Sequence, residues 1–177
     1  MSRAVIVVDI LNGFCRSGNL ASPRLAKVIP PVKELLERET DAGSSLIFLA
    51  DTHVPDDPEF RTFPPHCIAG SGEEEVVDEL QPFLEGAALI TKSRYSGFYE
   101  TGLEQELGRI NPDEVLVVGV CTDICVMYTV AGLRNRGYRV TVPGDCVETY
   151  DAPGHDAEQI NRFALDHMRD ILGARVE

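Results

Sequence analysis

The heptapeptide GVCTDIC, residues 119–125, holds two cysteines directly after an apolar run. The run 115–118 is typical of a buried strand, and the segment after Cys125 has the period of a helix. A helix start offers unpaired N–H groups and a partial positive charge, and both favour a thiolate. Cys125 is therefore a candidate nucleophile. The alternative is a small buried hydrophobic residue, the commoner role of a cysteine between a helix and a sheet.

A carboxylate and an amine follow other apolar runs in the same way. Asp9 ends the run 4–9, and Lys92 ends the run 87–92. The carboxyl ends of parallel strands share one sheet edge, so we expect Asp9, Lys92 and Cys125 to lie together. There the carboxylate would exchange a proton with the thiol, and the ammonium would supply positive charge. An ordinary ion pair beside a structural cysteine is the alternative.

The same heptapeptide predicts a place for developing negative charge. The backbone N–H groups of Cys121 and Cys125 are candidates for an oxyanion hole, with Thr122 and Asp123 as helix caps. Neither this loop nor DILNGF carries a GxGxxG or GxxxxGK[ST] pattern. We therefore expect no nucleotide cofactor.

The stretch ADTHVPDDPEFRTFPPH, residues 50–66, gathers imidazole and carboxylate side chains. Asp51 and His53 are two residues apart at a strand end and so face the same side, and Glu59 and His66 follow in the loop. Such ligands suit Zn²⁺, Mn²⁺ or Fe²⁺. The competing interpretation is a polar surface loop, but two of the chain's four histidines stand here, and we favour a metal site.

Three other residues are set apart from this ligand set. Cys67 adjoins His66, and adjacent residues rarely face one ion. His155 and His167 lie in or near the last predicted helix, where we expect packing or solvent contact.

Short β-branched runs alternate with helical segments, the pattern of repeated βα units. We expect an α/β fold with three αβα layers and a central, mostly parallel sheet. Its strands are expected at 4–9, 44–51, 87–92, 114–120 and 138–143, and its helices at 30–43, 72–83, 101–110, 122–137 and 153–176. In the last helix one apolar stripe should pack on the sheet, formed by Ile160, Phe163, Ala164, Met168 and Ile171.

Length and charge narrow the class of protein. At 177 residues and 44% hydrophobic composition we expect one domain over residues 1–177. The net charge of -13 argues against nucleic acid or an anionic membrane as a partner. No apolar segment approaches the roughly 20 residues of a membrane span, and the N-terminus lacks a signal-peptide pattern. We expect a cytoplasmic protein whose five cysteines are free thiols.

The order of the segments VVDILNGF, DTH, FPPH, TKSRYSGF, GVCTDICV and GYRVTV resembles the nicotinamidases, which are isochorismatase-like cysteine hydrolases. The likeness covers nearly the whole chain and implies that Asp9, Lys92 and Cys125 are the catalytic triad. The implied reaction converts nicotinamide to nicotinic acid and ammonia through a cysteine thioester. A divalent metal, with zinc as first candidate, would bind the pyridine nitrogen; the resemblance gives it the ligands Asp51, His53 and His66, with Glu59 as the fourth.

The resemblance implies further details. The peptide bond between Val120 and Cys121 should be cis, and Phe14 and Tyr95 should form aromatic walls of the pyridine pocket, with core packing as their alternative role. The substrate would be a small amide. Family members often associate, so a homo-oligomer is an open expectation. The chain is shorter between Ala69 and Lys92 than the longer members, which leaves the shape of the pocket lid undetermined.

Three other functions compete with this one. A related cysteine hydrolase would act on another small amide or on isochorismate, although such relatives usually lack the Asp-x-His and later-His set. A metal-only hydrolase would use bound water as its nucleophile. A non-catalytic α/β binding module would be expected to lack members of the triad.

Overall fold

The computed structural model describes residues 2–177, and these residues form a seven-stranded sheet in the order β3-β2-β1-β4-β5-β7, with β6 beside β4. All of the strand pairs are parallel. The strands are β1 (Arg3–Val8), β2 (Ser45–Asp51), β3 (Ala88–Lys92), β4 (Glu114–Val120), β5 (Val140–Val142), β6 (Val147–Glu148) and β7 (Arg175–Val176).

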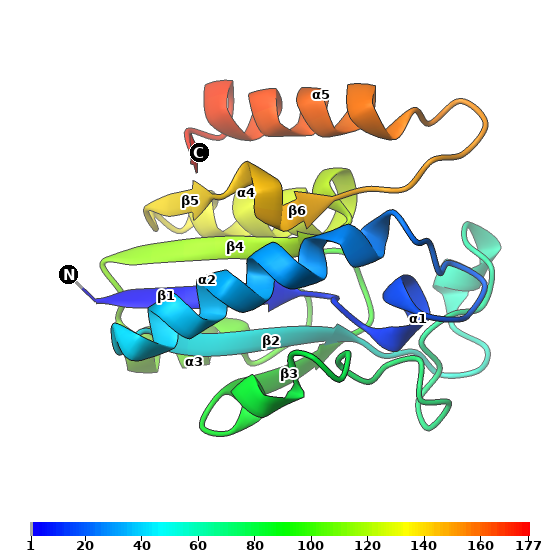
Figure 1. Ribbon diagram of the computed structural model, residues 1–177, viewed down its shortest axis with the longest axis horizontal. Coiled ribbons are helices and arrows are strands. Elements are labelled where there is room, and N and C mark those ends of the chain that lie inside the picture. The colour runs from blue at the N-terminus through cyan, green and yellow to red at the C-terminus, as the bar shows by residue number, and fades with distance from the viewer. Residues whose placement is uncertain (1) are drawn as a thin grey trace.

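Helices cover both faces of this sheet (Figure 1), which confirms the expected αβα layers. The helices are α1 (Asn12–Cys15), α2 (Ile29–Asp41), α3 (Leu103–Ile110), α4 (Met127–Asn135) and α5 (Ala157–Asp170). The short 3-10 turns are η1 (Leu25–Val28), η2 (Pro58–Arg61), η3 (Gln81–Leu84) and η5 (Gly144–Cys146), and η4 (Thr122–Val126) is a π-helical turn.

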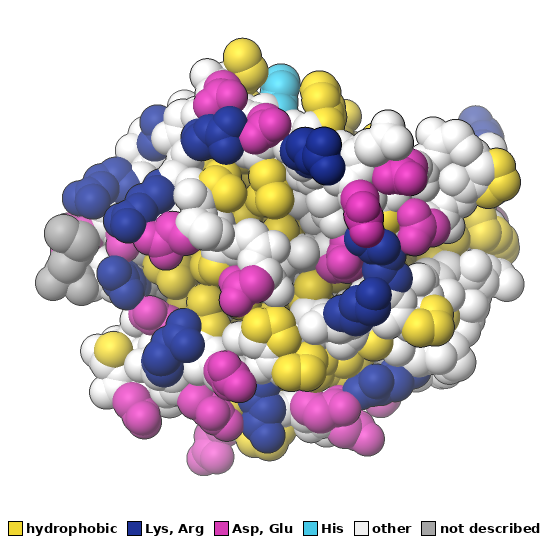
Figure 2. All heavy atoms as spheres, turned by 45° about the horizontal axis from the view of Figure 1, so that its top comes forward, with side chains coloured by type: hydrophobic (Ala, Val, Ile, Leu, Met, Phe, Trp, Pro, Cys, Tyr) yellow, Lys and Arg dark blue, Asp and Glu magenta, His cyan; other side chains and the backbone are white. Residues whose placement is uncertain are grey.

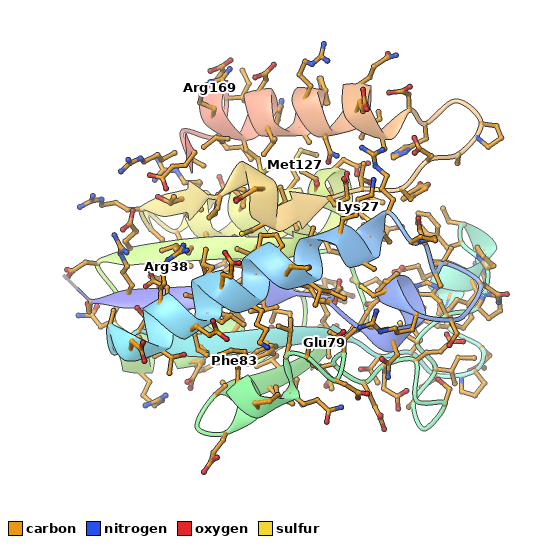
Figure 3. The ribbon with its side chains drawn as sticks, in the orientation of Figure 1. Lys27, Arg38, Glu79, Phe83, Met127 and Arg169 are labelled. Atoms are coloured by element: carbon orange, nitrogen blue, oxygen red, sulfur yellow. The ribbon has the colours of Figure 1, made fainter. Side chains whose placement is uncertain are left out.

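Alternate residues of β1 belong to different cores. Val5 and Val7 pack with α2 and η1, whereas Ile6 and Val8 pack with α3, α4 and α5. This alternation is expected of a strand buried on both faces. On the outer side, Lys27 and Arg38 are exposed near opposite ends of the segment formed by η1 and α2 (Figure 3).

The face shown in Figure 2 carries acidic and basic side chains intermixed over its whole width. No helix among residues 2–177 combines the length and the apolar character that crossing a bilayer requires.

The predicted helix at 72–83 is wrong. The segment is a loop that ends in the short turn η3. Its Glu73 carboxylate accepts a hydrogen bond from the backbone N–H of Cys67, and Val76 pairs with Leu11 in an antiparallel bridge. Contacts to other segments, and side-chain bonds to loop backbone, override a helical period here.

The last predicted helix is too long, and its apolar stripe is partly wrong. Ala164 and Met168 are buried, but Phe163 is 62% exposed and Ile171 is 70% exposed. Only the narrow stripe that contains Ala164 and Met168 faces the core, so Phe163, one residue before Ala164, is turned away from it. The chain leaves the helix through Gly173, whose φ of 69° is left-handed, and then forms β7.

The carboxyl ends of four neighbouring strands carry the polar residues of interest. Asp51 and Lys92 are paired as the last residues of β2 and β3, and Asp9 directly follows β1. Beside Asp9, Gly119 of β4 has a φ of 122°, and a Cβ there would lie 2.0 Å from the carbonyl oxygen of Val8. Glycine at this position therefore allows β4 to approach β1 where the two strands end.

Candidate active site

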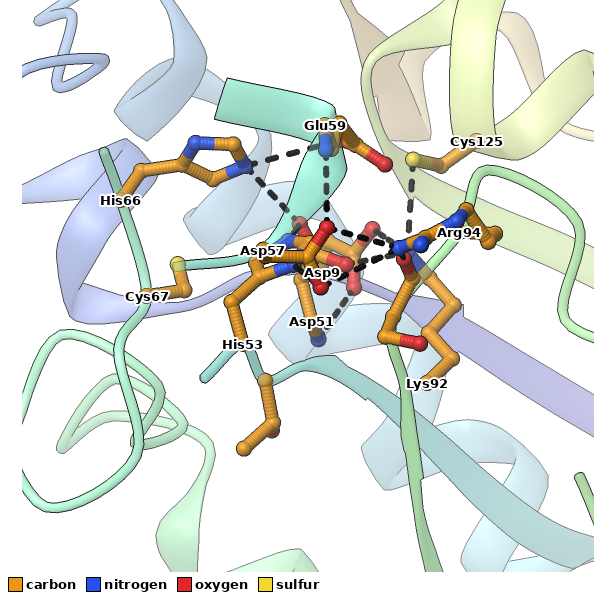
Figure 4. A network of polar contacts seen from close by, with 12 residues as sticks. Asp9, Asp51, His53, Asp57, Glu59, His66, Cys67, Lys92, Arg94 and Cys125 are labelled. Atoms are coloured by element: carbon orange, nitrogen blue, oxygen red, sulfur yellow. Dashed lines mark hydrogen bonds and ion pairs between the residues drawn. The ribbon is translucent and has the colours of Figure 1, made fainter. Parts of the chain in front are cut away.

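The structure brings Asp9, Lys92 and Cys125 together at this sheet edge (Figure 4). Lys92 Nζ lies 2.8 Å from Asp9 Oδ2 and donates to Cys125 Sγ over 3.4 Å. All three residues are buried. An ion pair between Asp9 and Lys92 is thus present, but it is in contact with the thiol rather than separate from it.

Lys92 also connects this group to the metal loop, a link that the spacing of the residues did not predict. Its Nζ donates to Asp51 Oδ1 over 3.0 Å, and the backbone N–H of Asp51 donates to Asp9 Oδ1 over 2.9 Å. Asp51 therefore contacts both the acid and the amine of the candidate triad.

Burial changes the protonation expected for this group. It raises the pKa of Cys125 well above the ordinary value, against the opposing charge of Lys92. Burial also raises the pKa of Asp9 to about 6, although the charge of Lys92 acts against it. For Lys92 burial lowers the pKa, but the negative neighbours Asp9 and Asp51 more than compensate, so its pKa is raised. Burial thus acts against the thiolate that the helix start was expected to favour.

The turn that carries Cys125 differs from the expected helix start. It is the π-helical turn η4, which begins at Thr122, so Thr122 and Asp123 lie inside its first turn and do not cap it. Asp123 Oδ1 instead accepts from Thr149 Oγ1 over 2.6 Å, and Asp123 Oδ2 lies 3.0 Å from His155 Nε2.

Two details of the neighbouring backbone bear on the site. The peptide bond Val120–Cys121 is cis, as the resemblance implied. Cys121 and Cys125 both line the cavity described below. Their N–H groups stay a prediction for the oxyanion hole.

The second group consists of Asp51, His53, Glu59 and His66, whose candidate ligand atoms all lie within 4.8 Å of one another. Asp51 Oδ2 is 3.1 Å from His53 Nε2 and 3.2 Å from His66 Nε2. Glu59 Oε1 is 3.8 Å from His66 Nε2, and the Glu59 side chain is 6% exposed. The four predicted ligands therefore lie in one cluster, and Cys67 is outside it as expected.

The remaining ring nitrogens of the histidines contact acceptors outside the group. His66 Nδ1 is 2.8 Å from the carbonyl oxygen of Pro64, and His53 Nδ1 is 3.1 Å from Asp57 Oδ2. An acceptor on one ring nitrogen leaves the other free to bind a metal. In both rings that other nitrogen is the Nε2 that faces Asp51.

The charges of this group fit a divalent cation. Glu59 Oε2 is buried without a hydrogen-bond partner among residues 2–177, and an unpaired buried carboxylate is costly. Burial lowers the pKa of His53, but the hydrogen bond to Asp51 and its charge outweigh this and raise that pKa to about 9. The carboxylates thus attract protons to the imidazoles, and a cation would replace those protons.

Asp57 and Arg94 are polar residues of the site that the spacing of the ligands did not identify. Asp57 Oδ1 accepts from the backbone N–H of Glu59 over 2.8 Å as the cap of η2. Arg94 Nη1 lies 2.9 Å from Asp57 Oδ1 and 3.2 Å from Asp57 Oδ2. The sequence Asp-Pro-Glu is a recognisable cap signal, but it carries no sign of the contact with His53.

A cavity of about 310 Å³ is lined by residues of both groups. Phe14 and Tyr95 are in its wall, with the Phe14 ring 5.7 Å from the ring of His66. Several further wall residues were not predicted, among them Phe63, Ile124 and Tyr150. The Tyr150 ring stacks on the His155 ring, with the ring centres 4.2 Å apart. The packing role expected for His155 therefore includes support of this wall.

Comparison with known proteins gives consistent matches over the whole chain. The Isochorismatase domain family matches residues 3–173. Nicotinamidase 1 of Arabidopsis thaliana is 34% identical over 97% of this chain and 79% of its own length. The crystal structure of N-carbamoylsarcosine amidase from Thermoplasma acidophilum is 34% identical with a TM-score of 0.87, covering 100% of this chain and 96% of that one.

A third match is the pyrazinamidase of Pyrococcus horikoshii, whose structure was determined in complex with zinc. It is 28% identical with a TM-score of 0.88, covering 99% of this chain and 98% of that one. Relatives with this fold therefore include proteins named for different amide substrates.

Proposed function

The chain belongs to the isochorismatase family of hydrolases, and on that premise we propose that it hydrolyses nicotinamide to nicotinic acid and ammonia, with Cys125 as nucleophile. The observation that carries this proposal is the shared cavity. The thiol of Cys125 and the ligand cluster around Asp51 border the same space, so one small molecule can contact both. Family membership alone does not select the substrate, because the amidase from Thermoplasma acidophilum is named for N-carbamoylsarcosine.

The ligand cluster accounts for a pyridine ring in the substrate. A divalent metal held by Asp51, His53, Glu59 and His66 would bind the ring nitrogen and so fix the direction of the carboxamide. Zinc is the first candidate, because imidazole and carboxylate ligands suit it and the pyrazinamidase from Pyrococcus horikoshii was crystallised with it.

The cavity walls supply the rest of the binding. Phe14 and Tyr95 border it with their rings, and Phe63 lies with its ring centre 6.3 Å from that of Tyr95. Flat apolar walls of this kind suit an aromatic ring.

The first half of the reaction uses the triad. Asp9 accepts the proton of the Cys125 thiol while Lys92 stabilises the thiolate, and the sulfur attacks the carboxamide carbon. The N–H groups of Cys121 and Cys125 hold the oxyanion of the tetrahedral intermediate. Asp9 then returns the proton to the departing nitrogen as the carbon–nitrogen bond breaks, and ammonia leaves a nicotinoyl thioester on Cys125.

The second half reverses these roles. Asp9 accepts a proton from a water molecule, which attacks the thioester carbon. The carbon–sulfur bond breaks, the proton returns from Asp9 to the Cys125 thiolate, and nicotinic acid is released. In each half Lys92 keeps Asp9 ionised until it accepts the proton, since its Nζ is 2.8 Å from the carboxylate.

A substrate comparison tests the proposal. We expect kcat/KM for ammonia release from nicotinamide to exceed that from N-carbamoylsarcosine by at least about 10²-fold, because only nicotinamide has a ring nitrogen for the metal. A preference for N-carbamoylsarcosine, or turnover of isochorismate without ammonia release from nicotinamide, would contradict it. Iodoacetamide tests the alternative of a metal-only hydrolase with bound water as nucleophile. Activity that survives alkylation of Cys125 cannot depend on the thiol.

A further inference from the structure

One carboxylate outside the ligand cluster contacts two of its members. Asp57 is buried, with 6% of its surface exposed. Its Oδ1 accepts from the backbone N–H of Glu59 over 2.8 Å, and its Oδ2 is 3.1 Å from Nδ1 of the His53 ring. The two oxygens of Asp57 thus contact the backbone of one candidate ligand and the side chain of another.

The contact with His53 bears on which ring nitrogen is available. Nε2 of His53 faces Asp51 Oδ2 at 3.1 Å, and Nδ1 faces Asp57 at the same distance on the other side of the ring. Nδ1 makes no hydrogen bond within residues 2–177, and the charge of the Asp57 carboxylate 3.1 Å away favours a proton on that nitrogen, which leaves the lone pair of Nε2 for the cluster. The two carboxylates together also determine how the ring is rotated.

The contact with Glu59 acts through the backbone. Glu59 is the second residue of the short turn η2, which Asp57 caps. A capped turn holds its first residues in one conformation. The side chain of Glu59 leaves that turn toward His66, with Oε1 3.8 Å from His66 Nε2. Without the cap, the loop would hold Glu59 less firmly.

Arg94 holds Asp57 from a different part of the chain. Its Nη1 lies within 2.9 and 3.2 Å of the two Asp57 oxygens. Arg94 is two residues beyond Lys92, the last residue of β3. Figure 4 shows the side chains of Asp57, Lys92 and Arg94 close to the ligand cluster. Because the Arg94 side chain is 34% exposed, this ion pair contributes little to stability, and its effect is mainly to fix the direction of the carboxylate.

We propose that Asp57 is a positioning residue that aligns His53 and Glu59 for one metal ion, and that Arg94 fixes Asp57 to the strand end that carries Lys92. The inference rests on the metal site of the proposed function and adds residues to it that bind neither metal nor substrate. Arg94 and Asp57 thereby couple the position of the metal to that of the catalytic amine.

Zinc affinity of the metal-stripped protein tests this directly, measured by competition with a chromophoric chelator. We expect Asp57→Ala to weaken zinc binding by about 10- to 100-fold, as is usual for outer-shell partners of metal ligands. Asp57→Asn should weaken it less, because an amide oxygen still caps the turn. Arg94→Gln should cause a smaller loss, and no further loss in a protein that already carries Asp57→Ala, since it acts only through that carboxylate.

Two exposed neighbours provide matched controls. Asp56→Asn removes the same charge one residue away, and Arg61→Gln removes an arginine from the same loop; both positions are exposed. We expect both variants to keep wild-type zinc affinity. Circular dichroism and thermal unfolding of each stripped protein show whether it folds, and if Asp57→Ala does not, Asp57→Asn and Arg94→Gln still give the test.

The outcomes separate this inference from the proposed function. A wild-type chain that binds no zinc, manganese or iron overturns the metal site and both proposals with it. A wild-type chain that binds zinc while Asp57→Ala and Arg94→Gln bind it equally well overturns only the positioning role. Additive losses for Arg94→Gln and Asp57→Ala would also overturn the proposed route through Asp57. Nitrogen NMR of zinc-loaded wild-type protein should find the His53 proton on Nδ1, and a proton on Nε2 would contradict the proposal.

Discussion

The two sides of the cavity are built in different ways. On the nucleophile side, Asp9 follows β1 and Lys92 ends β3, two strands that both pair in parallel with β2, and Cys125 lies in the turn that follows β4. On the metal side only Asp51 belongs to a strand. The other three ligands lie in the loop after β2, where the ordered elements are η2 and an isolated bridge between His53 and Ile68.

This difference shows what fixes the positions of the side chains on each side. Backbone pairing between strands places the acid, the amine and the turn with the thiol, whereas contacts with the Asp57 carboxylate and the Pro64 carbonyl place the imidazoles. Asp51 joins the two sides, because it contacts Lys92 with one oxygen and both histidines with the other. We therefore expect changes on the two sides to be separable except at Asp51 and at the Asp57–Arg94 pair.

The largest effect is expected on the nucleophile side. Cys125→Ala should reduce turnover of nicotinamide by at least about 10⁴-fold, because the covalent step is lost. The sheet and the metal loop do not depend on the sulfur, so zinc affinity should stay within about twofold of wild type. Steady-state ammonia release and zinc competition on the same preparation check both statements. Substantial residual turnover would remove Cys125 from the mechanism.

Asp9→Asn should be the next most damaging change, with a loss of about 10²- to 10⁴-fold in kcat, the usual range for general acid–base catalysis. Lys92 keeps its contact with Asp51 in this variant, so the buried ammonium is not left without a partner. Thermal unfolding of the variant should therefore stay cooperative. Near wild-type kcat would show that another group moves the proton.

His66→Ala tests the metal side by itself. Loss of one ligand should weaken zinc binding by at least about 10²-fold, beyond the range expected for an outer-shell change. Because His66 does not contact the triad, the rate at which iodoacetamide alkylates Cys125 should change by less than about threefold. Alkylation rates of the stripped proteins measure this. A large change would mean that the two sides are not separable.

The pH profile gives a smaller effect with a defined sign. Burial raises the pKa of Asp9 to about 6. A protonated Asp9 cannot accept the thiol proton, so at saturating metal kcat/KM should be constant above that pKa and fall about tenfold for each pH unit below it. In Asp9→Asn this acidic limb should be absent from the residual activity. An unchanged limb in that variant would assign the titration to another group.

The sequence predicted that the residues of the nucleophile side lie together, because their positions depend on the order of the strands. The positions of Asp9, Lys92 and Cys125 follow from the parallel order of the strands, and parallel strands follow from alternating βα segments. The expectation of a thiolate considered the helix start and not the depth of burial, which acts in the opposite direction. Cys125 is 8% exposed, and that burial raises its pKa.

On the metal side, spacing identified residues that the structure brings together in one candidate cluster, but not the contacts that hold them. Asp51 and His53 share a face by strand geometry, yet the approach of Asp57 and Arg94 depends on how an irregular loop folds back. The same limitation affected the segment 72–83, where Glu73 bonds to loop backbone instead of continuing a helix. The burial predicted for Phe163 and Ile171 was wrong for a related reason, because a helical period does not tell how wide the buried face is.

The most direct test of the account compares nicotinamide with benzamide, which lacks the ring nitrogen, in metal-loaded and metal-stripped enzyme. If the metal orients the ring toward Cys125, the loaded enzyme should prefer nicotinamide by at least about 10²-fold in kcat/KM, and stripping the metal should abolish most of that preference. Equal rates for the two amides in the loaded enzyme, or a preference that survives removal of the metal, would contradict the claim that both sides of the cavity act on one substrate.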